Sequence, residues 1–270
     1  MAQTPFRDRT VLVTGASSGI GRETALAFAA AGANLVLVAR RATVLAKVAA
    51  ETRKLGASTL VAAADVTQPA AVAACFRKAF KRFGAVDVVI NNAGVLIPAK
   101  VVDLKTSDLQ RMLDVNLLGA LYVMQEAVRQ MREQGRGHIV NVGSLAGRRG
   151  FSPLGGYCAT KFALIGLTEA LRTELVGERI NVSLVLPGVV DTPMASTAQH
   201  DPATADVWPE ALTMPASWVV WSIFLAIRFR LAEIAVPPGS ALIEKLAALA
   251  PGATDALLRR ATDAARRMKR

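Results

Sequence analysis

Short apolar runs rich in β-branched residues recur along the chain and are separated by longer segments of helical character. Six of these runs lack the polar alternation of a half-exposed strand, which is typical of strands buried on both faces of a parallel sheet. They are TVLVT (10–14), NLVLVA (34–39), TLVAA (59–63), VDVVI (86–90), HIVNVG (138–143) and INVSLVL (180–186). EIAVP (233–237) predicts a last strand.

Helical periodicity fills the gaps between these runs. The predicted helices cover 20–31, 43–55, 68–83, 107–134 and 154–176. Gly32 predicts a C-terminal cap, and Ser107 with Gln110 predicts a capping box. The alternation predicts a single α/β domain over 1–270, a Rossmann-like, doubly wound parallel sheet of about seven strands with helices on both faces.

Composition adds few constraints to this fold. Hydrophobic residues make up 52% of the chain, enough for a large core. The N-terminal MAQTPFRDRT has no apolar run of the kind a secretory signal needs. The apolar segment 216–227 is shorter than the roughly 20 residues of a membrane span, so we expect a buried core helix. Cys75 and Cys158 are expected to be small buried hydrophobes in a reduced, cytoplasmic compartment.

The formal net charge of +11 would attract anionic partners, or it is simply a solvated surface. A basic protein that binds nucleic acid or a membrane surface is therefore one hypothesis. The chain contains no long basic run and no nucleic-acid motif, so we rank this hypothesis last and expect no nucleic-acid partner.

Three glycines follow the first predicted strand in TGASSGIG, at positions 15, 19 and 21. Glycine permits a tight turn and lets a pyrophosphate approach the backbone at a helix N-terminus. The spacing departs from G-x-G-x-x-G, and a plain turn is the alternative. The strand–turn–helix context favours dinucleotide binding.

The end of the second strand bears on the choice of dinucleotide. Many such sheets place an acidic residue there to hold the ribose 2′-hydroxyl. Here Ala39 takes that position and is followed by Arg40 and Arg41. Arginine binds phosphate through paired donors. The sequence therefore favours NADP(H) over NAD(H), and two solvated surface arginines are the alternative.

Candidate polar groups follow the later strands. NNAG follows the fourth strand with Asn91 and Asn92, and Ser144 follows the fifth. Asn116 lies in an apolar helix, where a buried amide needs partners. Tyr157 and Lys161 are one helical turn apart, so they share a face. Alone, each feature has a structural explanation, such as a turn, a core hydrogen bond or a packed aromatic with a snorkelling lysine.

Together these motifs resemble the short-chain dehydrogenase/reductase family. The matching stretches occur in the family's order over about 8–195. They are TGASSGIG, Asp65-Val66, NNAG, Asn116, Ser144, Tyr157 with Lys161, and Pro187-Gly188 with Thr192.

The resemblance implies a set of catalytic roles. Tyr157 would be the acid or base in carbonyl–alcohol interconversion, and Lys161 would lower its pKa and bind the nicotinamide ribose. Ser144 would hydrogen-bond the carbonyl oxygen, and Asn116 would hold a water in a proton relay. No metal is implied.

The cofactor contacts implied by the motifs form a longer set. They are Gly15, Ser17, Ser18, Gly19, Ile20, Gly21, Arg40, Arg41, Asp65, Val66, Asn92, Ala93, Gly94, Tyr157, Lys161, Pro187, Gly188, Val189 and Thr192.

The resemblance weakens after Thr192. Residues 193–215 are predicted to form a substrate lid, and His200 within it is expected to be solvated. Residues 240–270 are predicted to form a basic helical extension that contacts another subunit or, less favoured, a membrane surface. A homodimer or homotetramer is expected, although this extension puts the usual tetramer in doubt.

The predicted activity is an NADP(H)-dependent oxidoreductase acting on a lipophilic carbonyl or alcohol, because apolar residues surround the Tyr–Lys pair. Arg148 and Arg149 are expected to be solvated loop charges, with an anionic substrate as the alternative for them. A non-catalytic NADP(H)-binding regulator on the same fold is the alternative function.

Overall fold

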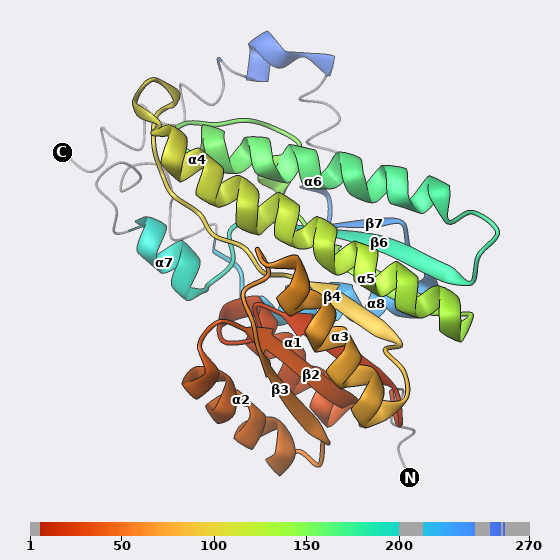
Figure 1. The fold of residues 1–270 in the computed structure, drawn as a ribbon. Coiled ribbons are helices and arrows are strands. Elements are labelled where there is room, and N and C mark those ends of the chain that lie inside the picture. The colour runs from red at the N-terminus through yellow and green to blue at the C-terminus, as the bar shows by residue number, and fades with distance from the viewer. Residues whose placement is uncertain (1–5, 200–212, 241–248, 255, 257–270) are drawn as a thin grey trace.

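Seven parallel strands form one twisted sheet in the computed structural model, which describes residues 6–199, 213–240, 249–254 and 256 (Figure 1). Their order is β3-β2-β1-β4-β5-β6-β7, as expected of a doubly wound fold. The strands are β1 (Thr10–Thr14), β2 (Asn34–Ala39), β3 (Thr59–Ala63), β4 (Val88–Asn91), β5 (Gly137–Val142), β6 (Ile180–Pro187) and β7 (Glu233–Val236). The predicted fold class is confirmed.

Helices cover both faces of this sheet. One apolar core cluster joins the sheet to α1, α2 and α8, and a second joins it to α3, α5 and α6. Figure 1 shows α5 and α6 in front of the sheet with α8 behind it. The α-helices are α1 (Gly19–Ala30), α2 (Ala42–Lys54), α3 (Pro69–Phe83), α4 (Thr106–Leu113), α5 (Gly119–Gln134), α6 (Gly155–Glu174), α7 (Pro193–Gln199) and α8 (Ala216–Phe229). Short 3-10 turns lie at η1 (Val101–Asp103) and η3 (Leu145–Gly147).

The predicted helix over 107–134 is interrupted. A π-helical turn, η2 (Asp114–Leu118), separates α4 from α5. The predicted capping box is wrong, because Ser107 lies inside α4 and the preceding N-cap position makes no side-chain hydrogen bond. Gln110 instead donates to Asp114 Oδ1 at 2.7 Å. The predicted cap at Gly32 agrees with its left-handed φ of 86° just after α1.

The segment predicted as a buried core helix, α8, is buried on one side only. Val219, Ile223 and Ala226 are fully buried, whereas the Trp218 and Trp221 side chains are 48% and 62% exposed. Cys75 and Cys158 are buried free thiols, as expected. Among the described residues, no helix combines the length and apolarity that a membrane crossing requires.

The predicted lid and C-terminal extension are described only in part. Residues 193–199 form α7, while 200–212, including His200, lie outside the described residues. Most of the extension over 240–270 also lies outside them. The single-domain boundary, the lid and the extension stay predictions.

Candidate active site

The carboxyl ends of the strands border two adjoining pockets of about 270 Å³ each. The first lies over the glycine loop and the ends of β2 and β3, and the second lies beside Tyr157 and Lys161. Their linings share Ile20, Asn92, Gly94, Thr192 and Met194, so the pockets form one cleft. This edge is where open α/β sheets bind ligands.

The glycine loop leaves no room for side chains where it turns into α1. Gly15 and Gly19 have left-handed φ angles of 67° and 51°. A methyl group on Gly21 would lie 2.3 Å from the Gly15 carbonyl oxygen. The N-cap Ser18 makes no side-chain cap hydrogen bond, so the N–H groups of the first turn are available to an anion.

Two adjacent asparagines at the end of β4 have different roles. Asn92 lines both pockets, and Thr14 fixes it: its Nδ2 donates to Thr14 O at 3.0 Å, and its N–H donates to Thr14 Oγ1 at 2.9 Å. Asn91 is buried and donates to Ala120 O at 2.9 Å and to Asn141 Oδ1 at 3.1 Å. Asn91 therefore braces the core and does not face the cleft.

The pocket wall at the end of β2 is cationic. Ala39, Arg40 and Arg41 line it opposite Asp65 and Val66. Both arginines are exposed, and in the described part of the chain neither forms an ion pair. The carboxylate of Asp65 accepts hydrogen bonds from the N–H and hydroxyl of Thr67, at 3.0 and 2.9 Å. An anionic group on the ribose would meet arginine and no carboxylate at the end of β2.

Tyr157 lies in the second pocket beside Ser144, and only 9% of it is exposed. Burial raises the pKa of its phenol to about 12 and outweighs a hydrogen bond with Ser144 that lowers it. Ser144 itself accepts from Ala146 N at 3.1 Å and donates to Pro187 O at 3.3 Å. The phenol is therefore held protonated near neutral pH.

Lys161 lies behind the phenol, one turn along α6. Its Nζ donates to Val142 O at 3.0 Å and lies 5.7 Å from the centre of the Tyr157 ring. Burial lowers the pKa of Lys161 to about 8. Burial is the largest influence on the pKa of Tyr157 in this structure, and the lowering of that pKa by Lys161 stays a prediction.

The π-helical turn brings Asn116 against the chain after β4. Its Oδ1 accepts from Val95 N at 2.7 Å, and its Nδ2 donates to Val95 O at 2.9 Å and to Thr160 Oγ1 at 3.0 Å. Asn116 is buried and lines neither pocket. Its side chain thus ties Thr160 of α6 to Val95, which follows β4. The relay water expected at Asn116 stays a prediction.

Most of the predicted site residues line the cleft. The exceptions are Gly21, which packs under the loop, and Asn116. Apolar residues were expected around the Tyr–Lys pair, and Leu145, Phe151 and Leu154 line the cleft there with Met194. Val115 and Leu96 were not predicted, because they carry no motif and only the tertiary fold brings them to the cleft.

Arg148 does not face the cleft as a free charge. Its Nη2 donates to Glu169 Oε1 at 3.0 Å and also forms an ion pair with Glu233. These pairs link η3 to α6 and β7. Arg148 is therefore a structural contact and not the solvated loop charge expected from the sequence.

Comparisons with known proteins agree with this geometry. The family model described as short chain dehydrogenase matches residues 9–203. An uncharacterised oxidoreductase of Staphylococcus saprophyticus is 40% identical over 69% of this chain and 76% of its own length. Sorbitol dehydrogenase of Cereibacter sphaeroides is 37% identical over 68% and 71%, respectively. A 3beta-hydroxysteroid dehydrogenase of Mediterraneibacter gnavus is 36% identical over 73% and 71%.

Solved structures match nearly the whole fold. Levodione reductase superposes with a TM-score of 0.81 at 29% identity, covering 88% of this chain and 99% of the other. A short-chain dehydrogenase/reductase of Burkholderia phymatum in complex with NAD gives 0.80 at 28% identity, covering 91% and 94%.

Proposed function

The chain belongs to the short-chain dehydrogenase/reductase family, an NAD(P)-binding oxidoreductase family, and we propose that it uses NADP(H) to interconvert a lipophilic ketone or aldehyde with its alcohol. The observation that carries this proposal is the cluster of buried Tyr157 and Lys161 with half-buried Ser144, which adjoins a glycine-loop pocket. The two pockets adjoin, so a cofactor in the first would border a substrate in the second.

The residues of the first pocket fit a dinucleotide. The close approach of Gly21 to Gly15 leaves a cradle that any Cβ would fill, and the helix N-terminus above it favours phosphate. Arg40 and Arg41 would bind a 2′-phosphate, and Ala39 removes the acid that would repel it. A relative in complex with NAD has the same fold, so the preference for NADP(H) rests on these three residues.

Tyr157 would act as the proton donor in the reducing direction. A phenol whose pKa is held near 12 keeps its proton until the carbonyl oxygen gains charge, and Ser144 can donate a hydrogen bond to that same oxygen. The bound nicotinamide supplies the hydride in reduction and takes it in oxidation. The protein contributes the proton and the orientation of the carbonyl.

Lys161 would stabilise the phenolate that forms when Tyr157 gives up its proton. Its ammonium is fixed on Val142 O and is buried, where charge–charge interactions are strong. Fixing the cation through a main-chain carbonyl places it before the reaction starts, which is the condition for electrostatic catalysis.

The substrate side of the cleft is mainly apolar. Leu96, Leu145, Phe151 and Leu154 line it together with Met194 from α7. A lipophilic substrate fits this wall. Two relatives with nearly equal sequence identity to this chain are named for different substrates, a polyol and a steroid. Sequence similarity alone therefore does not identify the substrate class.

A substrate screen tests the proposal. NADPH oxidation at 340 nm is followed with cyclic ketones, long-chain aldehydes and, in the reverse direction with NADP, polyols and steroid alcohols. We expect turnover with the apolar carbonyls. Cofactor binding without turnover across the screen would contradict the proposal and favour a regulatory NADP(H)-binding protein.

A further inference from the structure

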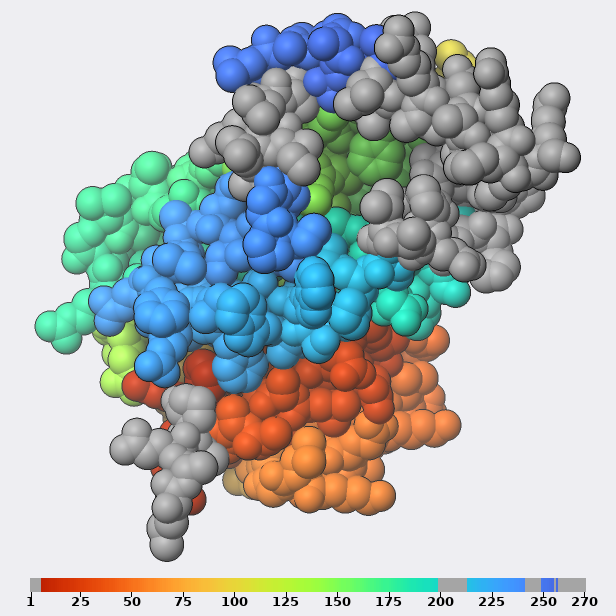
Figure 2. Space-filling view, turned by 180° about the vertical axis from the view of Figure 1, so that it is seen from behind, coloured from red at the N-terminus to blue at the C-terminus, as the bar shows by residue number. Residues whose placement is uncertain are grey.

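A second, larger cavity lies at the opposite edge of the sheet from the active site. It is a groove of about 1360 Å³ between α1, α8 and the amino ends of β1, β4, β5 and β6. Figure 2 shows the face on which α8 (light blue) lies next to α1 (red-orange). The groove shares no lining residue with either pocket of the active site. Its volume exceeds the roughly 300–1,000 Å³ typical of small-molecule sites.

One end of the groove is apolar. Its wall consists of residues from α1 and α8 with Phe6, namely Phe6, Leu26, Val220, Trp221, Phe224, Leu225 and Ile227. Phe224 stacks on Phe28 at 4.5 Å and meets the edge of Phe6 at 5.2 Å, so the floor is packed before anything binds. Trp221 is 62% exposed in the free chain, which leaves a large apolar surface to cover.

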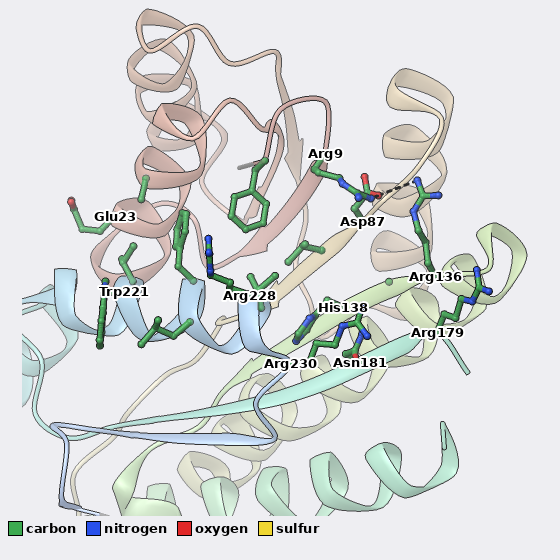
Figure 3. Close-up of a pocket in the computed structure, with 18 of the residues that line it drawn as sticks. Arg9, Glu23, Asp87, Arg136, His138, Arg179, Asn181, Trp221, Arg228 and Arg230 are labelled. Atoms are coloured by element: carbon green, nitrogen blue, oxygen red, sulfur yellow. Dashed lines mark hydrogen bonds and ion pairs between the residues drawn. The ribbon is translucent and has the colours of Figure 1, made fainter. Parts of the chain in front are cut away.

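The other end of the groove is cationic. Figure 3 shows Trp221 and Glu23 at one side of the groove and Arg9, Arg136 and Arg179 at the other. The groove is lined by five arginines: Arg9, Arg136, Arg179, Arg228 and Arg230. An array of guanidinium groups binds carboxylate or phosphate through paired N–H donors.

The three carboxylates of the lining already have partners. Asp87 pairs with Arg9 at 2.8 Å and with Arg136 at 3.5 Å. Glu178 pairs with Arg132 at 2.7 Å, and Glu23 pairs with Arg22. Within the described residues, Arg179, Arg228 and Arg230 form no ion pair with a carboxylate. The charge of these arginines is therefore available to an external anion.

The C-terminal cap of α8 is an arginine, at a position where glycine is usual. Arg230 caps α8 with a left-handed φ of 53°, a conformation that L side chains seldom adopt. Its charge also acts on the buried His138, which lines the groove and donates or accepts a hydrogen bond with Ser183 at 2.8 Å. Arg230 thus adds positive potential directly at the groove floor.

We propose that this groove is a binding site for an amphipathic anion, a single hydrocarbon chain bearing a carboxylate or phosphate head. The chain would lie on Phe224 and Trp221 between α1 and α8. The head would be held by Arg179 and Arg230, whereas Arg228 lies on the Trp221 side of the groove (Figure 3). Charge complementarity selects an anion, and the apolar wall selects a long chain over a free inorganic ion.

Calorimetric titration of the full-length protein without cofactor tests this site independently of catalysis. The probes are tetradecanoate below its micelle concentration, tetradecanol as the chain without charge, and acetate as the head without chain. We expect saturable binding of one tetradecanoate per chain, at least tenfold weaker binding of tetradecanol, and no measurable heat with acetate.

Variants locate the site. Arg179→Gln with Arg230→Gln is expected to weaken tetradecanoate binding about tenfold, because two charge-assisted contacts are lost. Arg77→Gln with Arg111→Gln removes the same charge from exposed positions that do not line the groove, and it should leave binding unchanged. Trp221→Ala should weaken binding several-fold, while Trp218→Ala, its exposed neighbour outside the groove lining, should not.

Unchanged thermal midpoints show that the variants are folded. Equal binding by the groove and control variants would overturn the proposal, as would tetradecanol binding as tightly as tetradecanoate. Binding to anionic vesicles but not to monomeric tetradecanoate would overturn it in favour of a membrane surface. A dimer that dissociates in Trp221→Ala, with no tetradecanoate bound, would overturn it in favour of a second copy of the chain.

Discussion

Lys161 and Tyr157 do not hydrogen-bond each other: the Lys161 ammonium lies 5.7 Å from the centre of the Tyr157 ring and donates to the Val142 carbonyl. The lysine is therefore held by β5, independently of the phenol. A cation held in this way can stabilise the negative charge that develops on the Tyr157 oxygen during proton transfer.

Replacing this cation should impair turnover more than folding. We predict that Lys161→Met lowers kcat by about 100-fold or more, because the phenolate that forms on Tyr157 loses its counter-charge. Steady-state kinetics measures the change. Lys78→Met, on the exposed face of α3, removes the same charge away from the site and should leave kcat unchanged.

The arginines after β2 should set the choice of cofactor. We predict that Arg40→Ala with Arg41→Ala weakens NADPH binding by about 10-fold to 100-fold while NADH binding stays within about twofold, because only the 2′-phosphate loses contacts. Fluorescence titration measures both constants. Arg53→Ala, in the last turn of α2 and outside the pocket lining, is the control. Equal losses for the two cofactors would mean that these arginines do not recognise the phosphate.

Alanine substitutions at Gly21 and Gly166 should change the stability of the fold in opposite directions, because only Gly21 is closely surrounded. Gly21→Ala would push a methyl group against the Gly15 carbonyl, 2.3 Å away, and should destabilise the fold by about 1–3 kcal/mol and weaken cofactor binding. Gly166→Ala, in α6 with no neighbour within 4 Å, should stabilise the fold by about 0.5–1 kcal/mol. Urea unfolding measures both. A neutral Gly21→Ala would show that the loop has room to shift.

Much of the fold follows from local pattern, because strands buried on both faces must be continuously apolar. The ends of the elements depend on tertiary partners. Asp87 stood inside a predicted strand, yet it pairs with Arg9, and β4 begins after it. Ser107 had the spacing of a cap, but the helix begins one residue before it.

The site residues that belong to sequence motifs could be predicted, whereas residues outside those motifs could not. Asn91 and Asn92 are adjacent in the sequence, but Asn91 ends β4 with its side chain in the core, whereas Asn92 follows the strand and lines the cleft. The arginine groove has no local signature at all. Arg9, Arg136 and Arg179 are far apart in the chain and meet because parallel strands begin at one edge.

The stability of the protein should depend on pH through His138. Burial, with the charge of Arg230, lowers the pKa of His138 from 6.5 to about 4. Between pH 6.5 and 4 the unfolded state therefore binds a proton that the folded state does not. The free energy of unfolding should fall by about 3 kcal/mol as the pH drops through this window.

A variant isolates this contribution. We predict that His138→Asn loses most of that pH-dependent fall, whatever its stability at pH 7. Urea unfolding at a series of pH values compares the two slopes. Parallel slopes for the variant and the parent protein would show that His138 titrates normally in the folded state.

The most direct test of the proposed chemistry compares the two tyrosines of the chain. Tyr157→Phe removes the proposed proton donor, and Tyr122→Phe makes the same change on α5, away from the cleft. With the carbonyl that gives the fastest NADPH oxidation in the screen, we predict that Tyr157→Phe loses at least about 1,000-fold in kcat. It should bind NADPH as tightly as the parent, and Tyr122→Phe should retain full turnover. Substantial turnover by Tyr157→Phe, with cofactor binding intact, would contradict the assignment of Tyr157 as the acid.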